Sequence, residues 1–179
     1  SITGTDGKST TAWLEYNLLK QEYGEEKVFL SGNFEIPFAE TVQTILEKWL
    51  KNGYIVVEIS SFMAYNIKAF TSTHSIFTNF ETDHLNWHSD LQDYFDAKMR
   101  LLEHTTGTSC INEQVFERAK EFGLRLPKNI PNVRVFGKRI NWIKPDSTET
   151  WKNDRIWVQI ENRNEPYDLY GEWGSGDLS

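Results

Sequence analysis

The chain has 179 residues, enough for one sizeable domain with a packed core. Its formal charge of −7 excludes a strongly basic nucleic-acid-binding or membrane-binding surface, and it has no apolar run of the roughly 20 residues that a membrane span needs. The single cysteine, Cys110, excludes an internal disulfide framework and a multi-cysteine zinc site, so we expect a cytoplasmic protein.

A glycine-rich segment near the start, Gly4 to Thr10 in GTDGKST, is called the glycine loop below. It shares the end of the nucleotide-binding pattern G-x-x-x-x-G-K-[ST], but its outer glycine, Gly4, lies two residues closer to the Gly-Lys pair than in the pattern. Such glycines let backbone N–H groups converge on phosphate oxygens at the positive start of a helix. We predict that Lys8 neutralises nucleotide phosphates and that Ser9 binds Mg²⁺. Ordinary helix capping is the alternative for so short a string.

Hydrophobic periodicity predicts alternating strands and helices along the rest of the chain. The run 54–59 is apolar almost throughout, which is typical of a strand buried on both faces of a parallel sheet. We therefore predict an α/β fold, a mostly parallel doubly wound sheet with helices on both faces and ligands beyond the carboxyl ends of the strands. The predicted helices cover 11–23, 39–50, 91–103 and 113–123, and the predicted strands cover 27–30, 54–59, 75–79, 109–112 and 133–136.

The character of the sequence changes after about residue 138. Within 139–179, the stretch RIWVQIENRNEPYDLYGEW alternates apolar and polar residues around an Asn-Arg-Asn turn, which predicts a β-hairpin. We expect an α/β core over 1–138 and a hairpin-rich antiparallel addition over 139–179.

Several polar residues stand at predicted strand ends. Glu58 closes a buried strand, where a carboxylate requires a cation or a hydrogen-bond donor. Mg²⁺ would be that cation in an ATP site, and a lysine partner is the alternative. Asp83 and His84 share a loop after the next strand, which favours a functional role for His84, whereas we interpret His88 as structural. Spacing alone makes Lys98 a solvated lysine on a helix surface.

With these positions assembled, the chain resembles the Mur ligase family, ATP-dependent ligases that add amino acids to the peptidoglycan precursor. The match to the family's central ATPase domain runs from residue 1 to about residue 140. Ser-Ser-Phe shortly after Glu58 and Gly-Asn before Ile-Pro are most similar to the members that add D-glutamate. Four blocks carry the resemblance: TGTDGKST, SGNFEIPF, VVEISSFMAYN and FTNFETDHLNWHSDLQDYFDAKMRL.

The resemblance implies a role for each matched position. The glycine loop (Gly4, Thr5, Asp6, Gly7, Lys8, Ser9 and Thr10) would bind ATP. Ser9, Glu58 and His84 would bind magnesium, while Asn33 and Ser60 would face the uridine-nucleotide substrate. Lys98 matches a family lysine that CO₂ converts to a carbamate, which positions a second Mg²⁺. The catalytic residues would then be Lys8, His84 and Lys98.

The reaction implied by the resemblance joins the carboxylate of UDP-N-acetylmuramoyl-L-alanine to the amine of D-glutamate through an acyl phosphate. The family places a uridine-nucleotide domain before this region and an amino-acid-binding domain after it. We therefore expect the chain to be the central part of a longer, monomeric enzyme and to be inactive alone.

The sequence also departs from the family pattern. Asp6 replaces a more usual asparagine, and Trp173, Gly174 and Asp177 occupy positions of the family stretch G-x-[HN]-N-x-x-N that meets the nucleotide. Two alternatives to a D-glutamate ligase remain open. One is another ligase of the superfamily, of the folylpolyglutamate or cyanophycin type. The other is a degenerate nucleotide-binding domain that serves as an interaction scaffold.

Overall fold

A computed structural model describes residues 1–33, 36–127, 130 and 132–137. The predicted hairpin and the positions Trp173, Gly174 and Asp177 lie outside the described residues. No helix in the described part of the chain has the length and apolar character needed to cross a membrane.

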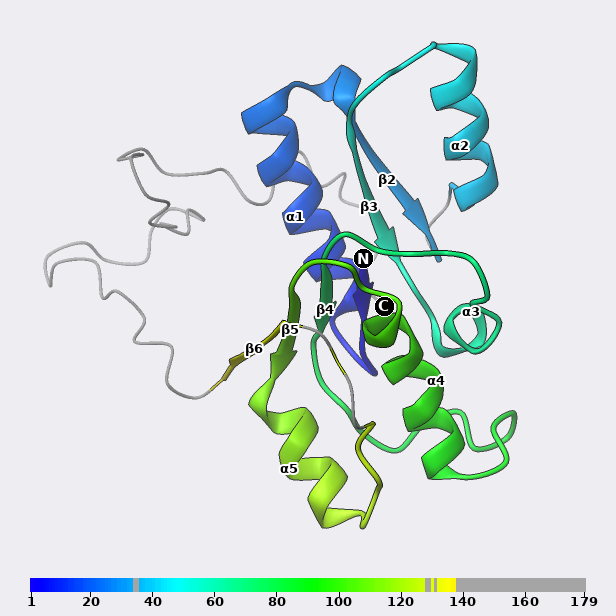
Figure 1. Cartoon of the computed structure of the whole chain (residues 1–179), viewed down its shortest axis with the longest axis vertical. Coiled ribbons are helices and arrows are strands. Elements are labelled where there is room, and N and C mark those ends of the chain that lie inside the picture. The colour runs from blue at the N-terminus through cyan, green and yellow to red at the C-terminus, as the bar shows by residue number, and fades with distance from the viewer. Residues whose placement is uncertain (34–35, 128–129, 131, 138–179) are drawn as a thin grey trace, which may run out of the picture.

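The described strands form one six-stranded sheet in the order β2-β3-β1-β4-β5-β6, and every pair in it is parallel (Figure 1). The α/β fold with a parallel sheet is therefore confirmed. The chain adds β2 and β3 on one side of β1 and the remaining strands on the other. This reversal beside β1 is the position where parallel α/β sheets bind ligands. The strands are β1 (Ile2–Thr3), β2 (Val28–Gly32), β3 (Tyr54–Glu58), β4 (Ser75–Phe77), β5 (Ser109–Asn112) and β6 (Val133–Phe136).

Helices cover both faces of the sheet, as predicted. Val56 points to a small cluster under α1, with Ile2 and Ala12, whereas its neighbour Val57 points to a larger cluster on the other face. This alternation follows from the period of two along a strand. The helices are α1 (Lys8–Tyr23), η1 (Glu25–Lys27), α2 (Phe38–Glu47), α3 (Ser61–Tyr65), α4 (Leu91–Glu103) and α5 (Glu113–Glu121).

The larger cluster fills the space between the sheet and α3, α4 and α5. Phe77, Phe80, Phe95 and Leu101 in it are all fully buried. Phe80 follows β4 and packs edge-on against Phe95 of α4, with ring centroids 4.9 Å apart. The loop after β4 is thereby anchored in the core, next to the carboxyl edge of the sheet.

Several helix boundaries differ from the prediction by one to three residues. Helix α1 begins at Lys8 rather than residue 11, because the glycine loop leads straight into it and Gly7 is its N-cap. Helix α2 ends at Glu47 rather than residue 50, and Trp49 beyond it has φ of 52°. Positive φ is incompatible with a continuing right-handed helix.

Candidate nucleotide and magnesium site

The glycine loop connects the end of β1 to α1, and its two glycines have different reasons to be there. Gly7 has φ of 71°, and a Cβ added to it would meet no atom within 4 Å, so only its backbone conformation favours glycine. Gly4 has φ of 155°, and a Cβ there would lie 1.9 Å from Thr78 Oγ1. The loop therefore passes directly against the residues that follow β4.

Lys8, the first residue of α1, turns back over the glycine loop. Its Nζ donates a hydrogen bond to the Thr5 carbonyl oxygen at 2.7 Å. The ammonium group thus lies beside the start of α1, where the unpaired N–H groups and the helix dipole already favour an anion. This is the arrangement expected of a phosphate-binding lysine.

Glu58 joins the glycine loop to the neighbouring strand. Its side chain, at the carboxyl end of β3, is only 1% exposed. Ser9 Oγ donates to Glu58 Oε2 at 2.7 Å, and Asn33 Nδ2 donates to Glu58 Oε1 at 3.2 Å. Three residues predicted from separate motifs are therefore in direct contact.

The donor set around Glu58 fits a hard cation. Among the described residues Glu58 takes part in no salt bridge, and its two carboxyl oxygens accept hydrogen bonds from a neutral hydroxyl and a neutral amide. Carboxylate and hydroxyl oxygens are ligands that Mg²⁺ prefers. In the part of the chain that the structure describes, no three His, Cys, Asp or Glu side chains cluster as a metal site. A metal here would therefore need the Ser9 hydroxyl as well.

His84 lies in the loop after β4 and reaches the glycine loop through an intermediate residue. Its Nε2 lies 3.3 Å from Asp83 Oδ2, and its ring centroid lies 5.8 Å from that of Tyr94. The Tyr94 hydroxyl in turn lies 3.2 Å from Thr5 Oγ1. The structure thus brings His84 to the same edge of the sheet as Glu58, without direct contact between them.

Lys98 is buried, which corrects the expectation from spacing that it is a solvated surface lysine. Only 1% of it is exposed, and its Nζ donates to the Gly4 carbonyl oxygen and lies 4.6 Å from the Tyr94 ring centroid. Burial, with a smaller contribution from the Lys8 charge, lowers the pKa of Lys98 to about 7. Lys98 points inward because it lies on the buried face of α4, which packs on the core.

Ser60 immediately precedes α3, and His88, in the loop before α4, packs against α3. Ser60 is the N-cap of α3 and its hydroxyl accepts a hydrogen bond from the Met63 amide. The buried His88 ring contacts Ser61 Oγ through Nε2 at 3.0 Å and Asp93 Oδ2 through Nδ1 at 3.1 Å. Both ring nitrogens of His88 therefore hold structural partners, in line with the structural interpretation of this histidine.

Three residues at this edge are absent from the predicted site residues. Tyr94 touches both Thr5 and Lys98, Asn79 pairs with the backbone of Asp6, and Gln114 holds the backbone of Phe80. Burial raises the pKa of Tyr94 to about 12, so its hydroxyl stays protonated at neutral pH. Of the three, only Asn79 has a sequence signal, as the polar residue that ends the predicted strand 75–79.

Comparison with known proteins agrees with this geometry. The family model described as the Mur ligase middle domain matches residues 2–165. UDP-N-acetylmuramoylalanine–D-glutamate ligase of Petrotoga mobilis is 43% identical over 162 residues, which cover 87% of this chain and 35% of that protein. The ligase of the same name from Aquifex aeolicus is 41% identical over 67% of this chain and 28% of its own length.

The chain thus spans about a third or less of the length of these relatives. The match covers the glycine loop, both core clusters and every candidate site residue from Gly4 to Lys98. On this evidence the chain belongs to the Mur ligase family and carries its middle domain.

Proposed function

We propose that the protein containing this chain is an ATP-dependent ligase that adds D-glutamate to UDP-N-acetylmuramoyl-L-alanine during peptidoglycan precursor synthesis. The contact of Ser9, Glu58 and Asn33 beside the glycine loop carries the proposal, because it joins three separate family motifs in one site. The names of the relatives support the choice of D-glutamate. Within the complete ligase, this chain supplies the ATP and Mg²⁺ site.

The reaction requires two negatively charged groups to meet. The carboxylate oxygen of the acceptor attacks the γ-phosphorus of ATP, and the bond to the β-phosphate oxygen breaks to give an acyl phosphate and ADP. The amine of D-glutamate then attacks the acyl carbon, loses a proton and expels phosphate. The first step needs cationic groups around the phosphates, which makes electrostatic stabilisation the largest contribution from the protein.

The glycine loop would bind the triphosphate. The first N–H groups of α1, which have no partner inside the helix, lie at the end of the loop, and the Lys8 ammonium group lies there on the Thr5 carbonyl. The flexible Lys8 stem allows its charge to turn to a phosphate oxygen. Lys8 would then offset the charge that develops as the γ-phosphate is transferred.

Ser9, Glu58 and His84 would hold magnesium, whose charge would further neutralise the phosphates. Glu58 is already oriented by Ser9 and Asn33, so its carboxylate needs little rearrangement. Asn33 and Ser60, at the carboxyl ends of β2 and β3, would face the uridine-nucleotide substrate.

Lys98 would become a carbamate and provide oxygen ligands for a second magnesium ion. Only a neutral amine can attack CO₂, with loss of one proton from nitrogen, and a pKa of about 7 leaves much of Lys98 neutral near neutral pH. Equilibration of the complete protein with ¹³C-bicarbonate should give a carbamate signal in ¹³C NMR that Lys98→Ala abolishes. Recovery of Lys98→Ala activity by a short carboxylic acid would support the same role.

Lys8→Ala tests the proposed function directly. In the complete protein it should reduce ATP-dependent D-glutamate incorporation at least about a hundredfold, because one essential transition-state contact is lost. The matched control is Lys20→Ala at the far end of α1, which removes an ion pair with Glu25 and a cation–π contact with Tyr16 and should leave turnover unchanged. Wild-type turnover by Lys8→Ala would refute the assignment.

The same assay separates the alternatives. Turnover with glutamate-tailed folates or with a cyanophycin-type acceptor, but not with UDP-N-acetylmuramoyl-L-alanine, would replace the assigned substrate. A wild-type protein that binds no Mg-ATP would favour the scaffold interpretation.

A further inference from the structure

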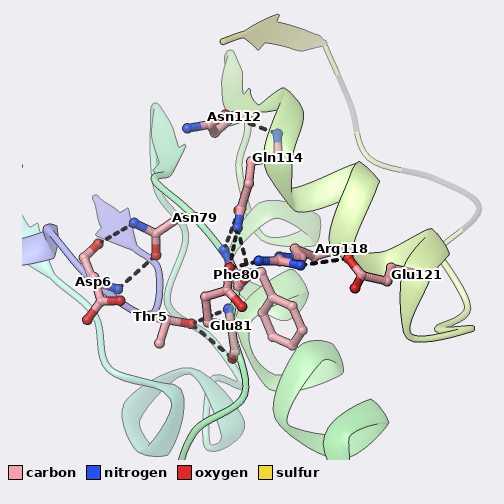
Figure 2. Close-up of polar contacts among 9 residues, drawn as sticks. All are labelled: Thr5, Asp6, Asn79, Phe80, Glu81, Asn112, Gln114, Arg118 and Glu121. Atoms are coloured by element: carbon pink, nitrogen blue, oxygen red, sulfur yellow. Dashed lines mark hydrogen bonds and ion pairs between the residues drawn. The ribbon is translucent and has the colours of Figure 1, made fainter. Parts of the chain in front are cut away.

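The residues that follow β4 hold the glycine loop through a dense set of hydrogen bonds (Figure 2). We call residues 78–81 the β4 exit segment. The Thr5 amide donates to the Asn79 carbonyl at 3.0 Å, and the Asp6 amide donates to Asn79 Oδ1 at 2.8 Å. Asn79 Nδ2 donates back to the Asp6 carbonyl at 3.0 Å. The position of the glycine loop is therefore set by the position of the β4 exit segment.

The Thr5 hydroxyl is fully used in this attachment. It accepts from the Glu81 amide at 2.9 Å and donates to the Glu81 carbonyl at 3.3 Å. Because Tyr94 stays protonated, its hydroxyl can donate to the remaining lone pair of Thr5 Oγ1 at 3.2 Å. One hydroxyl has one donor and two acceptor sites, so all three are filled. The Thr5 side chain thus anchors the loop and leaves phosphate contact to the backbone and Lys8.

Gln114, in the first turn of α5, holds the opposite side of the β4 exit segment. Its Oε1 accepts from the Phe80 amide at 2.9 Å. Its Nε2 donates to the Phe80 carbonyl at 3.0 Å and to Glu81 Oε1 at 2.9 Å. Figure 2 shows the Gln114 side chain extending from α5 to the backbone of Phe80. One side chain therefore bonds both backbone polar groups of Phe80.

Neighbouring groups fix the direction of this carboxamide. Asn112 caps α5 and accepts from the Gln114 amide at 3.0 Å, which sets the start of the helix. Arg118, one turn later, donates through Nε to Glu81 Oε1 at 2.8 Å and pairs with Glu121 at 2.6 Å. Glu81 is thus held by Gln114 and Arg118 from one helix and, through its backbone, by Thr5.

We propose that Gln114 is a positioning residue for nucleotide binding, which acts on the glycine loop through Phe80 and Glu81. This inference rests on the proposed function, because it assumes that the glycine loop binds phosphate. Gln114 itself touches neither Thr5 nor Asp6. Its loss would leave the buried Phe80 backbone without its side-chain partners and allow the β4 exit segment, with the attached loop, to move. Displacements of about 1 Å are sufficient to impair a preorganised site.

The chain offers a closely matched control. Gln92 in α4 makes the same kind of bridge to another backbone unit: its Oε1 accepts from the Arg125 amide at 2.8 Å and its Nε2 donates to the Arg125 carbonyl at 3.1 Å. This bridge lies away from the β4 exit segment. Gln92→Ala and Gln114→Ala therefore remove the same pair of backbone hydrogen bonds at two places, exposed at Arg125 and partly buried at Phe80, and only the second place leads to the glycine loop.

The test compares both variants with wild type in the complete protein, using Mg-ATP as the ligand. We expect Gln114→Ala to weaken Mg-ATP binding about tenfold, in the range of remote coupling effects, with the KM of the acceptor unchanged. Gln114→Glu should weaken it further, because it loses both donors and brings a carboxylate to Glu81. Gln92→Ala should leave Mg-ATP affinity within about twofold of wild type. Equal affinity of Gln114→Ala and wild type, or equal losses in both alanine variants, would overturn the proposal.

Hydrogen exchange of the nucleotide-free protein separates this inference from the proposed function. Gln114→Ala should speed exchange of the Thr5 and Asp6 amides, which are bonded to Asn79, and Gln92→Ala should not. Thermal melting identifies any variant that fails to fold. If wild type binds no Mg-ATP, the function is wrong, yet faster exchange would still support the coupling. Unchanged exchange in a folded Gln114→Ala protein would contradict it.

Discussion

At the scale of single residues, the most unusual group is the buried amine of Lys98. It contacts the Gly4 carbonyl and the face of Tyr94, and neither partner carries a formal negative charge. Asp83, Asp6 and Glu58 favour its protonation, but burial and the charge of Lys8 outweigh them and lower the pKa of Lys98 to about 7. The protonated form is therefore disfavoured in the folded protein.

This shift predicts how stability changes with pH. Between about pH 7 and pH 10.5 the unfolded chain keeps a proton on Lys98 that the folded chain has released, so the free energy of unfolding rises with pH. Lys98→Met removes this contribution. From pH 7 to pH 9.5, wild type should gain stability relative to Lys98→Met by the order of 2 kcal/mol. Urea unfolding in metal-free, CO₂-free buffer measures this, and parallel pH profiles would contradict it.

At the scale of elements, the site depends on how β1 turns into α1. The turn needs positive φ at Gly7 and close approach to Thr78 at Gly4. A side chain at Gly7 would meet only an unfavourable backbone conformation, whereas one at Gly4 would also collide with a neighbour. The backbone conformation alone therefore favours glycine at Gly7, whereas lack of space also favours it at Gly4.

We expect Gly7→Ala to lower the free energy of unfolding by about 1 kcal/mol, the cost of a left-handed conformation. Gly4→Ala should lower it by more than about 2 kcal/mol, because overpacking adds to backbone strain. Denaturant unfolding of both variants measures the difference. Gly7→Asn should be milder than Gly7→Ala, since asparagine tolerates this conformation. Equal losses for Gly4→Ala and Gly7→Ala would show that the contact with Thr78 is relieved at little cost.

At the scale of the whole molecule, every candidate site residue lies at or beyond the carboxyl edge of a parallel sheet, or on a helix that packs against that edge. The opposite edge carries ordinary buried hydroxyl contacts, such as Ser75 with Ser109 and Thr105. The two edges should therefore respond differently to ligand.

Mg-ATP should slow hydrogen exchange in the complete protein at the glycine loop and in residues 78–84. Residues 105–108, at the opposite edge, should exchange at unchanged rates, because they contact no part of the site. Mass spectrometry of peptides from both regions measures this. Uniform slowing at both edges would indicate general stabilisation instead of local binding.

How much the sequence predicts depends on the kind of signal. The bounds of 91–103, 109–112 and 133–136 are confirmed. Helix 91–103 has an amphipathic period and is capped by Asp90, and strand 109–112 ends where Asn112 caps α5. Strand β1 and helix α3 escape prediction, because two and five residues are too short for a periodic pattern.

The candidate site is partly accessible from sequence. Lys8, Ser9 and Glu58 stand at strand and helix ends where the fold pattern itself indicates a ligand. The burial of Lys98 is invisible to spacing, since it depends on which elements pack over α4. Gln114 could not be found at all, because a glutamine in a first helical turn is ordinary until its partner Phe80 is known.

The central strand β1 has a consequence for how the protein reaches its native state. Ile2 pairs with Glu58 and Thr3 pairs with Phe77, partners far along the chain. Such non-local pairings form slowly, since a large loop must close before any contact is gained. On the ribosome, the glycine loop is synthesised before β3 and β4 and stays unsupported until both strands have emerged. The capacity to capture nucleotide should therefore appear among the last events of folding.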